Sequence, residues 1–323
     1  MQLIAGDIGG TKTLLQLMRF DESGFTRLHL HRFDSGAYPE FDAVISEFLQ
    51  QLDDTTGISA MCFGVAGPIE QLDCSSSAKV TNLPWTLNTA QLSAQTGIKK
   101  IALINDFAAM AHGISVMTEA DLITVQAGAA RRDGHRFVLG AGTGLGGAQL
   151  IYVDDAFHVV PSEIGHTDFA AFDSDSVALS HYYIEQQGRC CIENLLSGPG
   201  IEHIFRFVLS TGLIDTSLAR NSNAALIADA GATDPAAAKT MELFASIYGS
   251  VAGNLALTNL AFGGVFLTGG IAAKNAELLS SAAFLKSFHN KGKMHQLMPR
   301  FPVYIVSNQE CGLLGAAVFA SQL

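Results

Sequence analysis

Apolar and polar positions alternate in short blocks along the chain, and these blocks predict a repeating order of strands and helices. Short apolar runs that end at glycine or polar residues are typical of strands, whereas apolar residues three or four positions apart are typical of helices. The predicted strands cover residues 2–5, 13–19, 60–65, 100–104, 136–139 and 148–153. The predicted helices cover residues 39–52, 88–96 and 107–115. Strands that alternate with helices indicate an α/β fold.

Each half of the chain opens with a strand, a glycine-rich turn and a second strand. The two turns are Gly6-Asp7-Ile8-Gly9-Gly10-Thr11 and Gly140-Ala141-Gly142-Thr143-Gly144-Leu145-Gly146-Gly147. Glycine permits positive φ and has no side chain, so that consecutive backbone N–H groups can converge on phosphate oxygens. A strand directly after each turn indicates a hairpin rather than a βαβ crossover. The pattern predicts two related α/β halves that hold a nucleotide between them.

Two other phosphate-binding motifs, one for each turn, do not fit the sequence well. Gly142-x-Gly144-x-x-Gly147 formally matches a dinucleotide-binding fingerprint, but that fingerprint requires a helix immediately afterwards and an acidic residue about twenty positions later. Residues 149–153 have strand character instead. A Walker loop is also disfavoured, because Thr11-Lys12-Thr13 lacks its glycine spacing.

One uncharged segment, residues 244–273, is long enough to span a bilayer. Asn254, Thr258 and Asn259 interrupt its apolar character, and Gly263-Gly264 precedes a short strand-like run at residues 265–267. We therefore predict a buried helix that leads into a buried strand, and no membrane span.

Length and charge narrow the function classes. The 323 residues are enough for two domains of ordinary size, for which we expect limits of 1–115 with 307–323 and 116–306. The formal net charge is −11 and the basic residues are scattered, so the chain lacks the electrostatic footprint of a nucleic-acid binder.

No basic leader precedes the apolar N-terminal residues, and we expect a cytoplasmic protein. The cysteines form no CxxC pair, which is typical of free thiols in a reducing compartment: Cys62, Cys74, Cys190, Cys191 and Cys311.

Several further motifs occur in a specific order together with the two turns. They are Leu103-Ile104-Asn105-Asp106-Phe107, Glu163-Ile164-Gly165-His166, Leu196-Ser197-Gly198-Pro199-Gly200 and Leu267-Thr268-Gly269-Gly270. In this combination the chain resembles the bacterial glucokinases almost from end to end. The resemblance implies the two-domain actin-like ATPase fold, related to ribonuclease H, with the substrate cleft between the domains. It also implies that the apolar segment 312–317 packs back on the N-terminal half.

The resemblance implies a sugar site and a catalytic base. Asp106 is similar to the family's general base, and Asn105, Asp106, Glu163, His166 and Glu193 are similar to its sugar ligands. Hydroxyl groups of a sugar suit carboxylate, amide and imidazole partners. Alternatives remain open from the residues alone: Asp106 can be a helix cap, Glu163-x-x-His166 can be half of a metal site, and Glu193 can be an ordinary surface glutamate.

The resemblance also implies a site for Mg-ATP. The phosphate ligands are expected at Gly6, Asp7, Ile8, Gly9, Gly10, Thr11, Gly142, Thr143 and Gly144. Gly269 and Gly270 are similar to the turn that lies against the adenosine. Asp7 is expected to act on Mg²⁺ through water, because Mg²⁺ keeps several waters and is held by one or two carboxylates and substrate phosphates. Lys12 remains without an assigned role, Trp85 is expected either near the sugar or in the core, and residues 209–235 are expected to be connection and scaffold.

The expected reaction is phosphorylation of the 6-hydroxyl of glucose by Mg-ATP, which yields glucose 6-phosphate and ADP. Two other classes remain as alternatives. One is a kinase for another hexose or an amino sugar, because a few hydroxyl contacts distinguish epimers. The other is a non-catalytic protein with the same fold, either a sugar-sensing regulator or a filament-forming ATPase; no helix-turn-helix precedes the first turn. A homodimer is expected from the resemblance alone.

Overall fold

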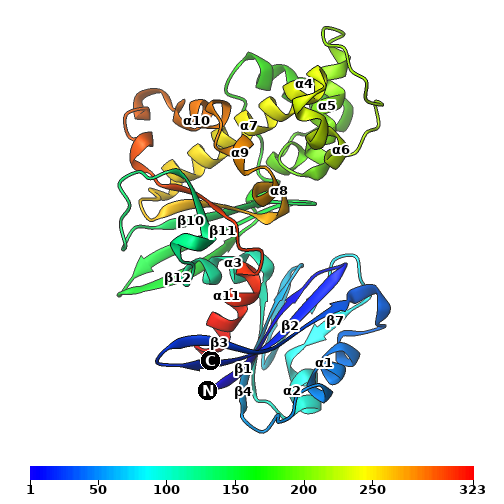
Figure 1. Cartoon of the computed structure of the whole chain (residues 1–323), viewed down its shortest axis with the longest axis vertical. Helices are drawn as coiled ribbons and strands as arrows, with labels where there is room; N and C mark the ends of the chain where they lie inside the picture. The colour runs from blue at the N-terminus through cyan, green and yellow to red at the C-terminus, as the bar shows by residue number, and fades with distance from the viewer. The chain divides into compact units, whose positions relative to one another are not determined.

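The chain folds as two units that are each built around a mixed β-sheet (Figure 1). The computed structural model describes all residues from Met1 to Leu323. Unit 1 comprises Met1–Thr118 and Glu310–Leu323, and unit 2 comprises Glu119–Gln309. The domain limits expected from the sequence differ from these units by a few residues at each junction.

The main sheet of unit 1 has the strand order β3-β2-β1-β4-β8. The first three strands run antiparallel, and β4 and β8 continue the sheet in parallel with β1. The predicted opening hairpin is therefore confirmed. The strands are β1 (Gln2–Ile8), β2 (Lys12–Asp21), β3 (Gly24–Asp34), β4 (Ile58–Val65) and β8 (Lys100–Asn105), and a second small sheet contains β5 (Ile69–Leu72), β6 (Ser75–Lys79) and β7 (Thr86–Asn88).

Helices cover both faces of this sheet, because side chains of β1 alternate between two buried clusters. Ile4 and Ile8 point into a cluster with α1, whereas Leu3 and Ala5 pack against α11. The helices of the unit are α1 (Phe41–Gln50), α2 (Thr89–Thr96), α3 (Asp106–Ile114) and α11 (Cys311–Ala320). Helix α11, red in Figure 1, lies against α3 and β1, so the C-terminal segment returns to the N-terminal sheet as predicted.

The sheet of unit 2 begins in the same way as that of unit 1. An antiparallel meander of β10, β11 and β12 is followed by the parallel addition of β13 and β14, in the order β12-β11-β10-β13-β14-β9. The prediction of two halves that open alike is confirmed. The strands are β9 (Leu122–Gln126), β10 (Arg136–Ala141), β11 (Leu145–Val153), β12 (Ala156–Ser162), β13 (Gly264–Thr268) and β14 (Val303–Val306).

A long buried helix, α7, forms the centre of the helical layer of unit 2. It spans Pro235–Asn259 and leads into the fully buried strand β13, as predicted. No helix of the protein, α7 included, is both long enough and apolar enough to span a bilayer. The remaining helices are α4 (Ser174–Gln187), α5 (Gly198–Ser210), α6 (Ala224–Asp229), α8 (Gly269–Lys274), α9 (Ala276–Leu279) and α10 (Ala282–His289). The segment 209–235, expected to be connection and scaffold, thus contains α6 of its own.

Short 3-10 turns complete both units. They are η1 (Ser35–Ala37) in unit 1, and η2 (Glu119–Asp121), η3 (Ile164–His166), η4 (Ile192–Asn194), η5 (Ala230–Ala232), η6 (Gly292–Met294) and η7 (Met298–Arg300) in unit 2. The turn η1 carries Ser35, which bonds to the first glycine-rich turn, and η3 and η4 carry the predicted site residues His166 and Glu193.

Candidate functional site

The first glycine-rich turn is shorter than the sequence predicted. Gly6, Asp7 and Ile8 belong to β1, and the turn itself consists of Gly9, Gly10 and Thr11. A Cβ atom at Gly6 would lie 2.6 Å from Phe63 Cδ1, and Ile8 is fully buried. Phosphate contacts at Gly6 and Ile8 stay a prediction. In the folded chain, glycine at position 6 makes room for the core, and the side chain of Ile8 fills it.

Ser35, which no sequence motif indicated, supports this turn. Its hydroxyl donates to the carbonyl of Gly9 at 2.8 Å, and its backbone N–H donates to the carbonyl of Thr11 at 3.1 Å. The hydroxyl of Thr13 lies 3.0 Å from that of Ser35. Both hydroxyl side chains are fully buried. The carbonyl groups of Gly9 and Thr11 thus accept neutral hydrogen bonds from a residue that lies more than twenty positions later in the chain.

A second segment approaches the same turn closely. A Cβ atom at Gly10 would lie 2.8 Å from the carbonyl oxygen of Thr81, and Asn82 beside it has a φ of 65°. Trp85 ends this segment, but its side chain is fully buried and its Nε1–H donates to the carbonyl of Tyr38 at 3.0 Å. Of the two roles left open for Trp85, the structure favours core packing.

Asp7 is the one charged side chain in β1, and it lies on the face of the sheet that α3 and α11 cover. It pairs in register with Gly64 of β4, which in turn pairs with Ile104 of β8. A Cβ atom at Gly64 would lie 3.0 Å from Ala109 Cβ of α3. Burial raises the pKa of the Asp7 carboxyl above its ordinary value, and the charge of exposed Lys12 opposes that shift.

Asn105 and Asp106 stand where β8 ends and α3 begins. Asn105 is the N-cap, and its side-chain oxygen accepts a hydrogen bond from the N–H of Phe107 at 2.9 Å. Asp106 is the first residue of the helix, and its Oδ1 also accepts from that N–H at 2.9 Å. The alternative that Asp106 is the helix cap is therefore wrong, because Asn105 occupies that position. A carboxylate in the first turn of a helix is stabilised by the helix dipole.

In unit 2 the second turn contracts to Gly142, Thr143 and Gly144 between β10 and β11. The N–H of Gly142 donates to the carbonyl of Gly144 at 2.8 Å. The N–H of Leu145, directly after the turn, donates to Oε2 of Glu193 at 2.7 Å. The carbonyl of Gly142 accepts from the N–H of Gly198 at 2.8 Å. Thr143 is exposed at the tip.

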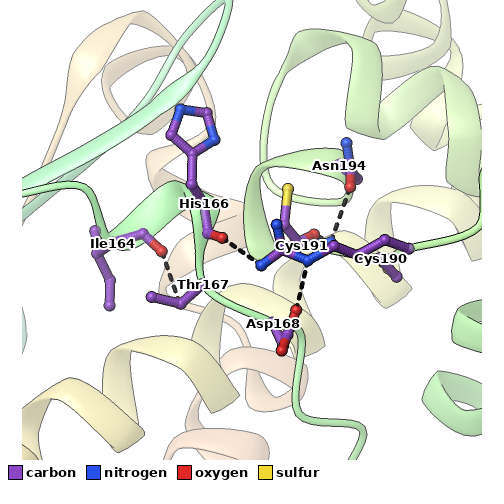
Figure 2. A network of polar contacts seen from close by, with 8 residues as sticks. Ile164, His166, Thr167, Asp168, Cys190, Cys191 and Asn194 are labelled. Atoms are coloured by element: carbon purple, nitrogen blue, oxygen red, sulfur yellow. Dashed lines mark hydrogen bonds and ion pairs between the residues drawn. The ribbon is translucent and has the colours of Figure 1, made fainter.

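Glu163, His166 and Glu193 lie on two irregular segments of unit 2 that pair with each other. The N–H of Ile192 donates to the carbonyl of Thr167 at 3.0 Å, which places η4 beside η3. Figure 2 shows the imidazole ring of His166 pointing away from Asp168 and Cys191. The side chains of Glu163 and His166 are exposed, and that of Glu193 is half-buried.

Arg189 holds this pairing and Asn194 braces η4, although no sequence motif indicated either residue. Arg189 forms an ion pair with Asp168 at 2.7 Å and donates to the carbonyl of His166 at 2.8 Å. Asn194 accepts from the N–H of Cys191 at 2.8 Å (Figure 2). No group of three or more His, Cys, Asp or Glu side chains in the protein is arranged to hold a metal ion, so no further ligands join Glu163 and His166 in a zinc site.

Gly269 and Gly270 begin α8 directly after β13. Gly269 has a φ of +87°, and a Cβ atom there would lie 2.6 Å from the carbonyl oxygen of Ala141 at the end of β10. Only glycine fits both constraints. A cavity of about 740 Å³ lies beside α8 in unit 2, lined among others by Asp229, Glu242 and Lys274.

Comparisons with known proteins extend over the whole chain. The family model described as Glucokinase matches residues 4–323. A glucokinase of Nostoc sp. is 36% identical over 99% of this chain and 99% of its own length. A crystal structure of glucokinase from an Antarctic psychrotroph is similar with a TM-score of 0.89 at 28% identity, over 100% of this chain and 99% of that one. A ROK family glucokinase from Streptomyces griseus, crystallised with glucose and AMPPNP, shares the fold with a TM-score of 0.67 at 20% identity, over 100% of both chains.

Proposed function

The chain belongs to the glucokinase family and is an ATP-dependent hexose kinase, and we propose that Asp106 is the general base that activates the 6-hydroxyl of glucose in its reaction. The two-domain mixed α/β structure is that of the actin-like ATPases, as the resemblance implied. Glucose 6-phosphate and ADP are the products of a glucokinase.

The position of Asp106 carries the proposal. Its carboxylate stands at the carboxyl end of β8, in the first turn of α3 and directly after the N-cap residue Asn105. Phosphoryl transfer requires mainly positioning and electrostatic stabilisation, and an aspartate that accepts the proton of the attacking hydroxyl is a recurring solution. Asp106 would accept that proton as the oxygen of glucose attacks the γ-phosphorus and the bond to the β-phosphate oxygen breaks.

We propose that the sugar is held by Asn105 and Asp106 of unit 1 and by Glu163, His166 and Glu193 of unit 2. The two carboxylates and the imidazole of unit 2 lie on paired segments, which gives them a common scaffold. Carboxylates accept hydrogen bonds from sugar hydroxyls, whereas the amide of Asn105 can both donate and accept. Selection among hexoses would follow from which of these contacts an epimer can make.

The phosphates of ATP would be bound by backbone N–H groups of Gly9, Gly10 and Thr11 and of Gly142, Thr143 and Gly144. The proposal requires the turns of both units to contact one nucleotide. Gly269 and Gly270 would lie against the adenosine, for which the adjacent cavity of unit 2 has room. Close approach of glycine backbone to phosphate is the physical basis of these contacts.

Asp7 fits a role toward Mg²⁺. Burial disfavours the ionised form of its carboxylate, so a bound cation would stabilise the negative charge. When bound, Mg²⁺ neutralises charge on the phosphates. Asp7 would orient the ion through water, which is consistent with the preference of Mg²⁺ for a few carboxylates and retained water molecules.

The decisive experiment measures ADP formation from Mg-ATP with a panel of hexoses and amino sugars, for the wild type and for Asp106→Asn. We expect strong glucose-dependent turnover in the wild type and a loss of about 10²–10⁴-fold in the variant, since that is the usual contribution of a positioned base. Glucose affinity should persist in Asp106→Asn, because asparagine can still hydrogen-bond the hydroxyl. Near-normal turnover of the variant would exclude Asp106 as the base.

Two further properties are proposed from the resemblance and can be measured on the same preparation. We propose a homodimer, which sedimentation equilibrium would detect as twice the chain mass, and a cytoplasmic location, which fractionation of the source cells would test. Greater turnover with another hexose or an amino sugar than with glucose would favour the first alternative. Binding of sugar without any ADP formation would favour the non-catalytic regulator.

A further inference from the structure

One short segment of unit 2, residues 193–198, holds the second phosphate turn at both of its ends. At one end, Oε2 of Glu193 accepts from the N–H of Leu145 at 2.7 Å. At the other end, the N–H of Gly198 donates to the carbonyl of Gly142 at 2.8 Å. Within the segment, the hydroxyl of Ser197 donates to the carbonyl of Glu193 at 2.8 Å. Turn and segment therefore form a closed ring of hydrogen bonds.

The contact between Glu193 and the turn is close. A Cβ atom at Gly144 would lie only 2.6 Å from Oε2 of Glu193, so glycine at this position lets the carboxylate approach the backbone. A hydrogen bond from a backbone N–H to an ionised carboxylate is about twice as strong as a neutral one. Only Oε2 is engaged in this bond, and Oε1 makes no hydrogen bond within the chain.

We propose that Glu193 is a positioning residue that couples sugar binding to the conformation of the phosphate turn 142–145. This inference rests on the proposed function, in which Glu193 is a sugar ligand. Oε1 would accept from a sugar hydroxyl while Oε2 holds the N–H of Leu145. A bound sugar then restricts the rotation of the carboxylate and favours the arrangement in which the turn is held.

By thermodynamic linkage, this coupling between the sugar and nucleotide sites acts equally in both directions. If sugar favours the held turn, sugar raises the affinity for the nucleotide, and the nucleotide raises the affinity for sugar by the same factor. A turn whose N–H groups are already oriented binds phosphate with less loss of conformational freedom. Nucleotide would therefore be bound most tightly when the acceptor hydroxyl is present.

The test compares Glu193→Ala with Glu193→Gln in the full-length protein. Titration calorimetry measures the affinity for Mg-AMPPNP, a non-hydrolysable ATP analogue, with and without saturating glucose. In the wild type we expect glucose to raise this affinity by about 5–150-fold, the usual range of coupling between sites. Glu185→Ala, at an exposed carboxylate on α4, is the matched control and should behave as the wild type.

The two variants distinguish the role of Oε1 toward the sugar from the role of Oε2 toward Leu145. Glu193→Gln retains an oxygen that can accept from Leu145, so its sugar-free affinity for Mg-AMPPNP should match the wild type while its affinity for glucose falls. Glu193→Ala loses both contacts, so its sugar-free affinity for Mg-AMPPNP should fall and glucose should no longer raise it. Recovery of the sugar-free affinity by glutamine is a result that a merely destabilising substitution would not produce.

Two outcomes would overturn the inference. One is a wild type that phosphorylates glucose but binds Mg-AMPPNP equally well with and without glucose. The other is a Glu193→Ala variant whose sugar-free affinity for Mg-AMPPNP equals that of the wild type. Both differ from failure of the proposed function, in which the wild type forms no ADP in response to glucose.

Discussion

The two glycine turns share a sequence pattern and a hairpin topology, yet different chemistry supports them. The hydroxyl group of Ser35, itself paired with that of Thr13, holds the turn 9–11 in unit 1. The carboxylate of Glu193 and the start of α5 hold the turn 142–144 in unit 2. The buried hydroxyls contact only protein groups, whereas a carboxylate has two oxygens and could contact a ligand and the turn together. If both turns bind phosphate as proposed, they would differ in whether they respond to the second substrate.

The strands that precede the turns differ as well. Asp7 and Gly140 each lie one residue before the last residue of their strand, β1 and β10. Unit 1 therefore places a buried carboxylate at this position, where unit 2 has no side chain. Under the proposals above, the ion contact would belong to unit 1 and the coupling contact to unit 2.

Among the variants that test the two turns, Asp7→Asn should lose the most activity. Without its carboxylate we expect kcat with Mg-ATP to fall by more than about tenfold, which corresponds to about 1.4 kcal/mol in the barrier. Steady-state kinetics over a range of Mg²⁺ concentrations would measure this loss. A kcat that is unchanged at every Mg²⁺ concentration would contradict the division of roles between the two turns.

The same variant makes a prediction about stability. Because the pKa of Asp7 is raised on folding, the folded state binds its proton more tightly than the unfolded state, whose ordinary value is 3.8. The wild type then loses stability as pH rises from 3.8 through the raised pKa. Asp7→Asn lacks this loss, so at neutral pH and without Mg²⁺ it should have the higher Tm. Equal Tm values throughout a pH series would contradict the burial of a charged Asp7.

Ser35→Ala tests the neutral support of the first turn. The substitution removes the donor to Gly9 and leaves the buried hydroxyl of Thr13 without that partner, which costs about 1–3 kcal/mol in the free energy of unfolding. Urea unfolding would measure the loss. The factor by which glucose raises the affinity for Mg-AMPPNP should stay within about twofold of the wild type. Loss of that factor in Ser35→Ala would remove the contrast between the turns.

Ser197→Ala tests the support of the second turn with a smaller effect on stability. Ser197 is the N-cap of α5 and also bonds to the carbonyl of Glu193, so we expect a loss of about 1 kcal/mol and a weaker effect of glucose on Mg-AMPPNP affinity. Asn223→Ala, which removes the N-cap of α6, is the matched control. If both variants leave the glucose effect intact, the ring around the turn is structural only.

The smallest expected effect is that of Lys12→Ala. The exposed ammonium lowers the pKa of Asp7, so its removal should shift the acid limb of the pH–activity profile upward by less than about one pH unit. Added salt should reduce the difference between variant and wild type, because it screens exposed charges. Lys99→Ala, also at an exposed lysine of unit 1, should not shift the profile. A shift as large for Lys99 as for Lys12 would indicate a general charge effect.

Local patterns account for what could be predicted about the fold. The order of strands and helices, the two hairpins and the buried helix before β13 followed from apolar periodicity and glycine positions, because these features depend on neighbours along the chain. Motif order along the whole chain indicated the glucokinase family, which the family model confirms. The position of Asn105 and Asp106 at the end of a strand followed in the same way.

Roles that depend on contacts between distant residues required the tertiary structure. The order of residues was enough to predict where glycines, carboxylates and strands occur, and hence the fold class and the family. Only the folded chain decided that Gly6 makes room for Phe63, that Trp85 belongs to the core, and that Glu193 reaches Leu145 across 48 positions. The physical reason is that local backbone preference is written in adjacent residues, whereas packing and hydrogen bonding depend on which segments the sheet brings side by side.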